Sequence, residues 1–348
     1  MQPADEQKEF PYKTLHQLAL ATLVAVILLI FFGALVRASG AGLGCPDWPR
    51  CWGSWWPPGS IEEVNFTTLP PEKFPPGVTP ADFNLTKMWT EYINRLVGVI
   101  IGLFVIATLI RALIPPTTNR FRLAAFAAFV LVVLNGWLGA QVVKSGLKPG
   151  MISIHLICAI LLMASLVWLV VRTRPPHFQE APADIPHWIP LGLLGTTVVQ
   201  ILLGARVREA LGFLEKSEAA ETLPRAEWLA QIPYWTDHLH RLSSWVVAAF
   251  ALALAVFALR GKLGGLKVQA LAIGGLILLQ IGFGIALAYA GLPPVFQFLH
   301  LACASVLVCL QLYVVFALRE SQKAPRERSR EALEDPLVPT RANELTFP

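Results

Sequence analysis

The chain has 348 residues, of which 55% are hydrophobic and only 15% are charged. This composition excludes an ordinary soluble globule, in which about a quarter of the residues are charged, and indicates a membrane protein. The net charge of +5 does not indicate nucleic-acid binding, because the basic residues gather in the loops between apolar segments, where membrane topology accounts for them.

Eight apolar segments are long enough to cross the bilayer, whose hydrocarbon core of about 30 Å needs about 20 helical residues. They lie near residues 17–37, 89–113, 123–143, 151–171, 188–207, 236–259, 268–290 and 295–318. These segments must be helical, since lipid cannot satisfy free backbone groups. We therefore predict an all-α integral membrane protein with eight transmembrane helices in contact with membrane lipid.

The chain order suggests two halves of four helices each. We expect a cytoplasmic N-terminus over 1–16, an N-terminal half over 17–172, a proline-punctuated cytoplasmic linker over 173–187, a C-terminal half over 188–318 and a charged tail over 319–348. The tail has no apolar period and is predicted to be disordered. Lysine and arginine are more frequent in the loops on the side of the termini, so both termini are predicted to be cytoplasmic.

The two halves repeat each other in sequence. The segment 155–159 (His-Leu-Ile-Cys-Ala) recurs 145 positions later at 300–304 (His-Leu-Ala-Cys-Ala), and the segment 91–96 recurs at 237–242, at an offset of 146. A third repeat relates Gly33–Arg37 to Gly204–Arg208. Duplication predicts two pseudo-symmetric four-helix bundles. Polar residues inside the spans are costly, so they are candidates for function.

Four repeated positions lie at one depth. Asn94, His155, His240 and His300 each lie about five residues into an even-numbered span, which is roughly 8 Å below the outer boundary. Two histidines at one depth on two helices can ligate one metal ion, and haem takes histidine as an axial ligand. Zinc would need more ligands. A hydrogen bond across helices is the alternative, but the duplicated pair favours haem sites near the outer face.

Four arginines accompany these positions. Arg95 and Arg241 directly follow Asn94 and His240, whereas Arg37 and Arg208 end the first and fifth predicted spans. Arginine binds carboxylates bidentately, so all four are candidates for binding haem propionates. For Arg37 and Arg208, snorkelling to lipid headgroups is an equal alternative.

Glu91 precedes Asn94 by three residues and Arg95 by four, so the three share a helix face. One interpretation is an ion pair with Arg95. The other is a carboxylate beside a reactive cofactor, suited to proton transfer or charge stabilisation. Asp237 is its repeat equivalent.

Cys45 and Cys51 lie in the long outer loop over 38–88. Because the outer side is oxidising, we expect a disulfide between them. The spacing leaves open whether the pair is structural or redox-active.

Taken together, these motifs resemble the haem A synthase family. The residues that carry the resemblance, in the family's order, are Val36-Arg37, Gly42-Leu43-Gly44-Cys45-Pro46-Asp47-Trp48-Pro49, Glu91-Tyr92 with Arg95, His155, His240-Arg241 and His300. The resemblance covers about residues 17–318 and implies a haem b cofactor on His240 and His300, with the substrate, haem O, in the N-terminal half. It implies oxidation of the C8 methyl group of haem O to a formyl group, with Glu91 as the catalytic glutamate. Haem O synthase and a terminal oxidase assembly pathway are the implied partners.

One position departs from the family's pattern. Asn94 stands where the family usually has a fourth histidine, so a substrate haem would have one strong protein ligand, His155. A bis-histidine electron carrier like a membrane cytochrome b would need both sites fully ligated, which Asn94 argues against. A non-catalytic haem-binding or haem-handling protein would need neither Glu91 nor the Cys45–Cys51 loop. The motifs therefore favour the enzyme.

Overall fold

The computed structural model describes residues 11–174, 183–215, 217 and 219–334. Within these residues it contains no β-strand, and eight helices are long and apolar enough to span a membrane. They are α1 (Lys13–Ala38), α2 (Leu85–Leu113), α3 (Asn119–Lys144), α4 (Pro149–Arg172), α5 (Trp188–Leu214), α8 (Tyr234–Leu259), α9 (Lys267–Tyr289) and α10 (Pro294–Glu334). The predicted all-α integral membrane class is confirmed.

The C-terminal ends of two helices lie well beyond the predicted spans. α5 continues to Leu214 instead of ending near residue 207, so Arg208 lies inside this helix rather than at its end. α10 continues to Glu334, past the expected end at residue 318. The prediction of disorder is therefore wrong for residues 319–334, while 335–348 lie outside the described residues. Glu, Lys, Arg and Ala are good helix formers and carry the helix beyond its apolar part.

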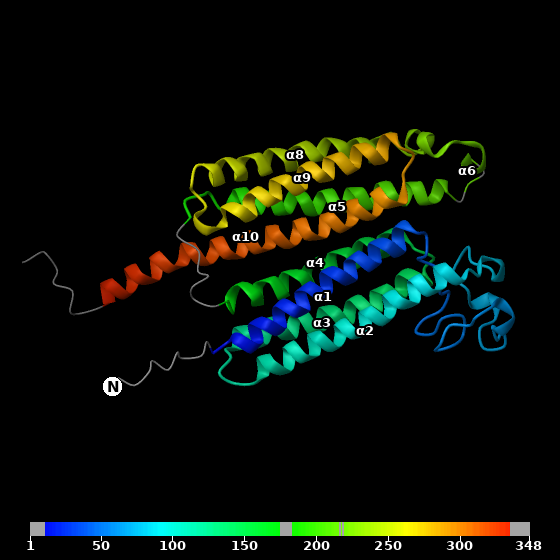
Figure 1. The fold of residues 1–348 in the computed structure, drawn as a ribbon, viewed down its shortest axis with the longest axis horizontal. Coiled ribbons are helices and arrows are strands. Elements are labelled where there is room, and N and C mark those ends of the chain that lie inside the picture. The colour runs from blue at the N-terminus through cyan, green and yellow to red at the C-terminus, as the bar shows by residue number, and fades with distance from the viewer. Residues whose placement is uncertain (1–10, 175–182, 216, 218, 335–348) are drawn as a thin grey trace, which may run out of the picture.

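The long helices pack as two groups of four (Figure 1). In the first group α1 contacts α2, α2 contacts α3, α3 contacts α4, and α4 returns to α1. In the second group α5, α8, α9 and α10 contact one another in the same cyclic order. The order of contacts agrees with a duplication, and a symmetry axis between the halves stays a prediction.

The two groups meet along α4 and α10. α10 contacts both α1 and α4, and α4 contacts α5. Of the most apolar 18-residue window in each helix, 44% is buried in α4 and 56% in α10, against 33% or less in the other six. The outward faces expose leucines such as Leu103 and Leu123. Apolar surface of this extent needs a lipid cover in a membrane protein.

The loops are unequal at the two ends of the bundle (Figure 1). The loop over 39–84 lies at one end, together with the short helices α6 (Ala219–Thr222) and α7 (Trp228–Gln231). The start of α1 and the C-terminal part of α10 lie at the opposite end. Which end faces the cytoplasm stays a prediction of the positive-inside rule.

Candidate functional site

The four repeated polar positions lie near one end of each helix group. His155, His240 and His300 each lie six residues after the first residue of their helices. Asn94 lies nine residues after the start of α2, because that helix begins at Leu85, earlier than predicted. The loop over 39–84 leads directly into this added first turn of α2.

Each of these positions has a buried polar atom without a hydrogen-bond partner. The atoms are Asn94 Oδ1 and the Nδ1 atoms of His155, His240 and His300. Buried polar groups are nearly always hydrogen-bonded, and an exception calls for a functional explanation. The backbones of Asn135, Gln200 and Gln280 lie close to the three imidazole rings from the neighbouring helices, without reaching full hydrogen-bond geometry at Nδ1. A backbone contact of this kind orients a ring and leaves its other nitrogen for a ligand.

His240 and His300 face each other in the C-terminal half. Their ring centroids are 6.5 Å apart, with an angle of 69° between the ring planes. A metal–imidazole bond is about 2 Å long and the ring adds about 1 Å on each side, so two histidines on opposite sides of one ion have centroids roughly 6 Å apart. The pair therefore fits the axial ligation of one haem. Among the described residues no cluster of three or more His, Cys, Asp or Glu side chains could hold a metal ion by itself.

A glycine of the neighbouring helix lies against each histidine ring. The distances from a Cβ atom built on the glycine to the ring Cε1 atom are 3.0 Å for Gly204–His240, 3.7 Å for Gly139–His155 and 4.0 Å for Gly284–His300. At Gly204 a side chain would force the ring to move. The three glycines belong to the sequence repeats and let the imidazole rings pack close to the facing backbone.

The fourth repeated position lacks this contact. Gly33 is the repeat equivalent of Gly204, and no heavy atom lies within 4 Å of its Cβ position. The residue equivalent to His240 is Asn94, whose shorter side chain does not reach Gly33. The N-terminal half therefore has one imidazole where the C-terminal half has two.

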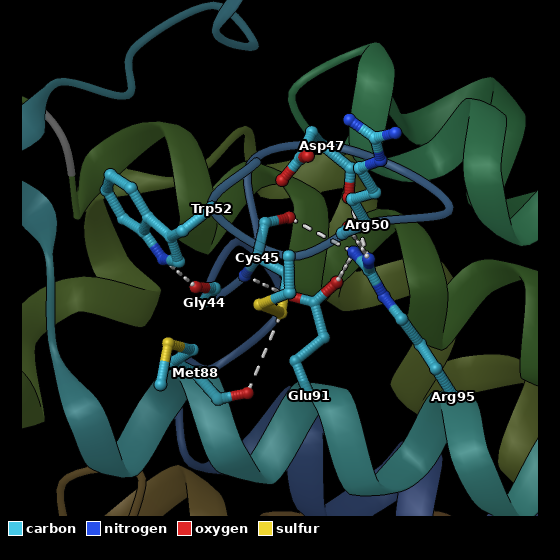
Figure 2. Close-up of polar contacts among 9 residues, drawn as sticks. Gly44, Cys45, Asp47, Arg50, Trp52, Met88, Glu91 and Arg95 are labelled. Atoms are coloured by element: carbon cyan, nitrogen blue, oxygen red, sulfur yellow. Dashed lines mark hydrogen bonds and ion pairs between the residues drawn. A yellow bond between two sulfur atoms is a disulfide. The ribbon is translucent and has the colours of Figure 1, made fainter. Parts of the chain in front are cut away.

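Glu91 is almost fully buried, with 4% of its surface exposed. Its Oε2 atom accepts a hydrogen bond from the backbone N–H of Cys45 at 2.9 Å, and its Oε1 atom accepts one from Arg95 Nη2 at 2.5 Å (Figure 2). The expected ion pair is thus present. Its second contact, with the loop, was not expected from the sequence.

Arg95 lies among backbone carbonyls of the outer loop (Figure 2). It donates to the carbonyl oxygens of Cys45 at 3.1 Å, Asp47 at 2.7 Å and Arg50 at 2.8 Å. The guanidinium of Arg95 contacts the loop in this structure, and its binding of a haem propionate stays a prediction. The loop folds back over the start of α2, and its carbonyls accept three hydrogen bonds from the Arg95 guanidinium.

The loop segment itself is compact and buried. Cys45 and Cys51 form the predicted disulfide, and both residues are fully buried. Trp52 Nε1 donates to the Gly44 carbonyl at 2.7 Å. A Cβ atom on Gly44 would lie 2.3 Å from the carbonyl oxygen of Lys87 in α2, so only glycine allows this approach.

Asp47 closes the same loop segment. Its Oδ2 atom accepts a hydrogen bond from the Gly53 N–H at 3.1 Å. Burial raises the pKa of the Asp47 carboxyl above its ordinary value, and hydrogen bonds from the backbone of Gly53 and Trp52 oppose that rise. The carboxylate stabilises the turn that presents the loop carbonyls to Arg95.

Arg37 and Arg208 lie at the junction of the two halves. Arg208 lines a cavity of about 250 Å³ together with Lys87 and Arg225. Its Nε atom has no hydrogen-bond partner, and its Nη2 atom is 3.5 Å from a Glu215 oxygen. The charge of Arg37 is close enough to act on Arg208. This positive site suits carboxylates, so propionate binding stays the prediction for both.

Two glutamines beside the histidines were missed from the sequence. Gln200 in α5 donates to the His240 carbonyl at 2.8 Å, and Gln280 in α9 donates to the His300 carbonyl at 2.8 Å. A single polar residue in an apolar helix gives little signal by itself. The signal that could have found Gln280 is its repeat equivalent, Asn135, which lies at the offset of 145.

The fold and the site define an integral membrane protein whose two helix groups present imidazole rings toward their interiors. The chain belongs to the COX15-CtaA family of cytochrome oxidase assembly proteins, whose family model matches residues 16–312.

Individual relatives cover most of the chain. A protein of Shewanella oneidensis named heme A synthase is 28% identical over 302 residues, which is 78% of this chain and 87% of the relative. A heme A synthase of Rhodopseudomonas palustris is 28% identical over 344 residues, covering 88% and 91%. One from Bradyrhizobium is 29% identical over 332 residues, covering 86% and 89%.

Proposed function

We propose that this protein is a haem A synthase, which oxidises the C8 methyl group of haem O to a formyl group. The observation that carries the proposal is the unequal pair of sites. One half has two neighbouring histidines, and the other has a single histidine on α4 and a buried carboxylate, Glu91, on α2. The names of the relatives and the motifs quoted above support the same reaction.

In the C-terminal half, His240 and His300 would hold haem b. When bound there, haem b supplies one-electron transfer. The chain's own contribution is to fix both imidazole rings and to keep water away. Arg241, the residue after His240, is a candidate for a propionate of this haem, and its ion pair with Asp237 at 2.7 Å would orient it.

In the N-terminal half, His155 would hold the iron of the substrate, haem O. Asn94 occupies the opposite position and offers only a weak amide ligand. A substrate site has to release its product, and a single strong ligand favours release. Arg37 and Arg208, at the junction of the halves, are the candidates for the substrate's propionates.

Glu91 would act on the reacting methyl group. It lies one turn outward from Asn94 on the same face of α2, so it borders the substrate without reaching an axial position. Converting a methyl to a formyl group removes electrons and protons in steps. A fixed carboxylate can stabilise the developing positive charge or accept the protons. The Cys45 N–H and Arg95 hold this carboxylate in place.

The orientation and partners follow from the same proposal. Both termini would be cytoplasmic and both haem sites would lie near the outer face. A haem O synthase would supply the substrate, and terminal oxidases would take the product.

The direct test is to express the chain in cells that make haem O but no haem A, and then to extract and separate the haems. We expect haem A from the wild-type chain and only haem O from a His155→Ala variant. Haem O alone from the wild-type chain, with both haem sites filled, would contradict the proposal.

A non-catalytic haem-handling protein is the second candidate. It is favoured by one observation, since both oxygens of Glu91 are already bound to Cys45 and Arg95 and could serve the loop alone. In the same experiment such a protein would bind haem O and return it unchanged.

A further inference from the structure

The C-terminal half contains a feature that the haem ligands alone do not explain. Gln200 on α5 donates its side-chain amide to the backbone carbonyl of His240, and Gln280 on α9 donates to that of His300, both at 2.8 Å. We call each of these hydrogen bonds an amide clamp. Each clamp ties the helix that carries a histidine to its neighbour at the level of that histidine.

The first clamp is itself held in place. The Ser243 hydroxyl, one turn along α8 from His240, donates its single hydrogen to Gln200 Oε1. Both ends of the Gln200 amide are therefore engaged. A carbonyl in a helix has a second lone pair after its intrahelical bond, and the Gln200 amide nitrogen binds it at His240.

The N-terminal half lacks both clamps. The repeat equivalent of Gln280 is Asn135, which is one methylene shorter. Among the described residues its amide makes no hydrogen bond to the His155 carbonyl. The repeat equivalent of Gln200 is Leu29, which has no side-chain donor. His155 and Asn94 are thus carried by helices that no such amide ties to their neighbours.

We propose that Gln200 and Gln280 are positioning residues that cause the C-terminal site to retain its haem. By fixing the backbone of His240 and His300, they hold the two rings at the spacing that one haem needs and slow its loss. The N-terminal site, without clamps, exchanges its haem. This inference rests on the proposed function, because it separates a resident cofactor from a substrate.

The test measures haem retention in the purified, full-length protein. In Gln200→Leu and in Gln280→Leu, transfer of haem from the C-terminal half to apomyoglobin should become about five-fold faster, which is the effect of losing one buried hydrogen bond. The electron paramagnetic resonance signal of the low-spin haem should also shift or broaden, because the angle between the rings is no longer fixed.

Gln311→Leu is the matched control. Gln311 Nε2 donates to Thr197 Oγ1 at 3.0 Å, so this variant removes a buried hydrogen bond between α10 and α5 of the same half without touching a histidine. We expect its haem signal and haem loss to equal those of the wild type. Equal effects in all three variants, or no effect in the two clamp variants, would overturn the proposal.

A gain-of-function variant keeps the test decisive if the leucine variants do not fold. Leu29→Gln combined with Asn135→Gln should slow haem exchange in the N-terminal half several-fold. An unchanged exchange rate would overturn the proposal that amide clamps retain haem. If the two leucine variants lose haem faster but the wild-type protein makes no haem A, then the proposed function is overturned and the role of the two glutamines is not.

Discussion

The two halves keep the same ion pair but surround it differently. Glu91–Arg95 and Asp237–Arg241 are repeat equivalents with the same four-residue spacing. The Arg95 side chain is 14% exposed, and the loop over 39–84 supplies its carbonyl partners, whereas the Arg241 side chain is 46% exposed. The same ion pair is thus covered by a loop in one half and half exposed in the other. The covered pair lies in the half with one histidine, and the exposed pair lies in the half with two.

The largest effect should come from the ligands of the C-terminal half. His240→Ala and His300→Ala should each abolish the low-spin haem spectrum, because an iron with one imidazole no longer has two strong axial ligands. Haem in the N-terminal half should remain. Optical spectra of the purified variants can decide, and two single variants that both keep a bis-histidine spectrum would show that another residue ligates the iron.

Substitutions of Glu91 and of its repeat equivalent Asp237 test whether only Glu91 takes part in the reaction. Glu91→Gln keeps the shape and hydrogen-bonding capacity of the side chain but removes its charge, so haem A formation should fall by about a hundred-fold or more, as expected for loss of acid–base catalysis. Asp237→Asn should retain most activity. Quantified haem A and haem O from whole cells provide the measurement.

The Glu91→Gln variant also separates the two interpretations of that residue. A catalytic role predicts accumulated haem O with both sites loaded. A purely structural role predicts loss of haem from the N-terminal half. Normal amounts of haem A would reject catalysis by Glu91.

A smaller, spectroscopic effect should follow from making the halves alike. Asn94→His places a second imidazole opposite His155, so haem in the N-terminal half should change from high spin to low spin and exchange more slowly. Asn94→Ala is the control and should stay high spin. If both sites are occupied and Asn94→His leaves the spectrum unchanged, then Asn94 does not face the iron.

The smallest effect concerns the glycines beside the rings. In Gly204→Ala the new methyl group would lie 3.0 Å from the His240 ring, so the ring must shift. We expect a perturbed low-spin signal and a loss of about 1–3 kcal/mol of stability. In Gly33→Ala nothing lies within 4 Å, and the change should be within about 0.5 kcal/mol. Thermal unfolding of both variants checks this pair, and equal losses would mean that ring contact is not the cause.

The sequence predicted the eight helices because long apolar runs in a membrane leave few other structures. It misplaced the ends of α5 and α10. In α10 polar residues continue the helix, whereas in α5 the charged pair Arg208-Glu209 interrupts the apolar run and Leu211, Phe213 and Leu214 continue the helix beyond it. The sequence indicated His155, His240 and His300 because they lie in segments that recur between the two halves. The carbonyl partners of Arg95 could not be found, because backbone groups carry no sequence signal and their placement depends on the folded loop.

The contacts of Cys45 have a consequence for how the loop over 39–84 opens. Its N–H and its carbonyl are both bound by α2, through Glu91 and Arg95. Lifting the loop would break these two hydrogen bonds and expose the buried Glu91–Arg95 ion pair to solvent. We therefore expect the loop around Cys45 and the first turns of α2 to open together. Reduction of the disulfide alone would leave both closed, so the Cys45 amide should exchange its hydrogen at the rate of a transmembrane helix rather than that of a surface loop.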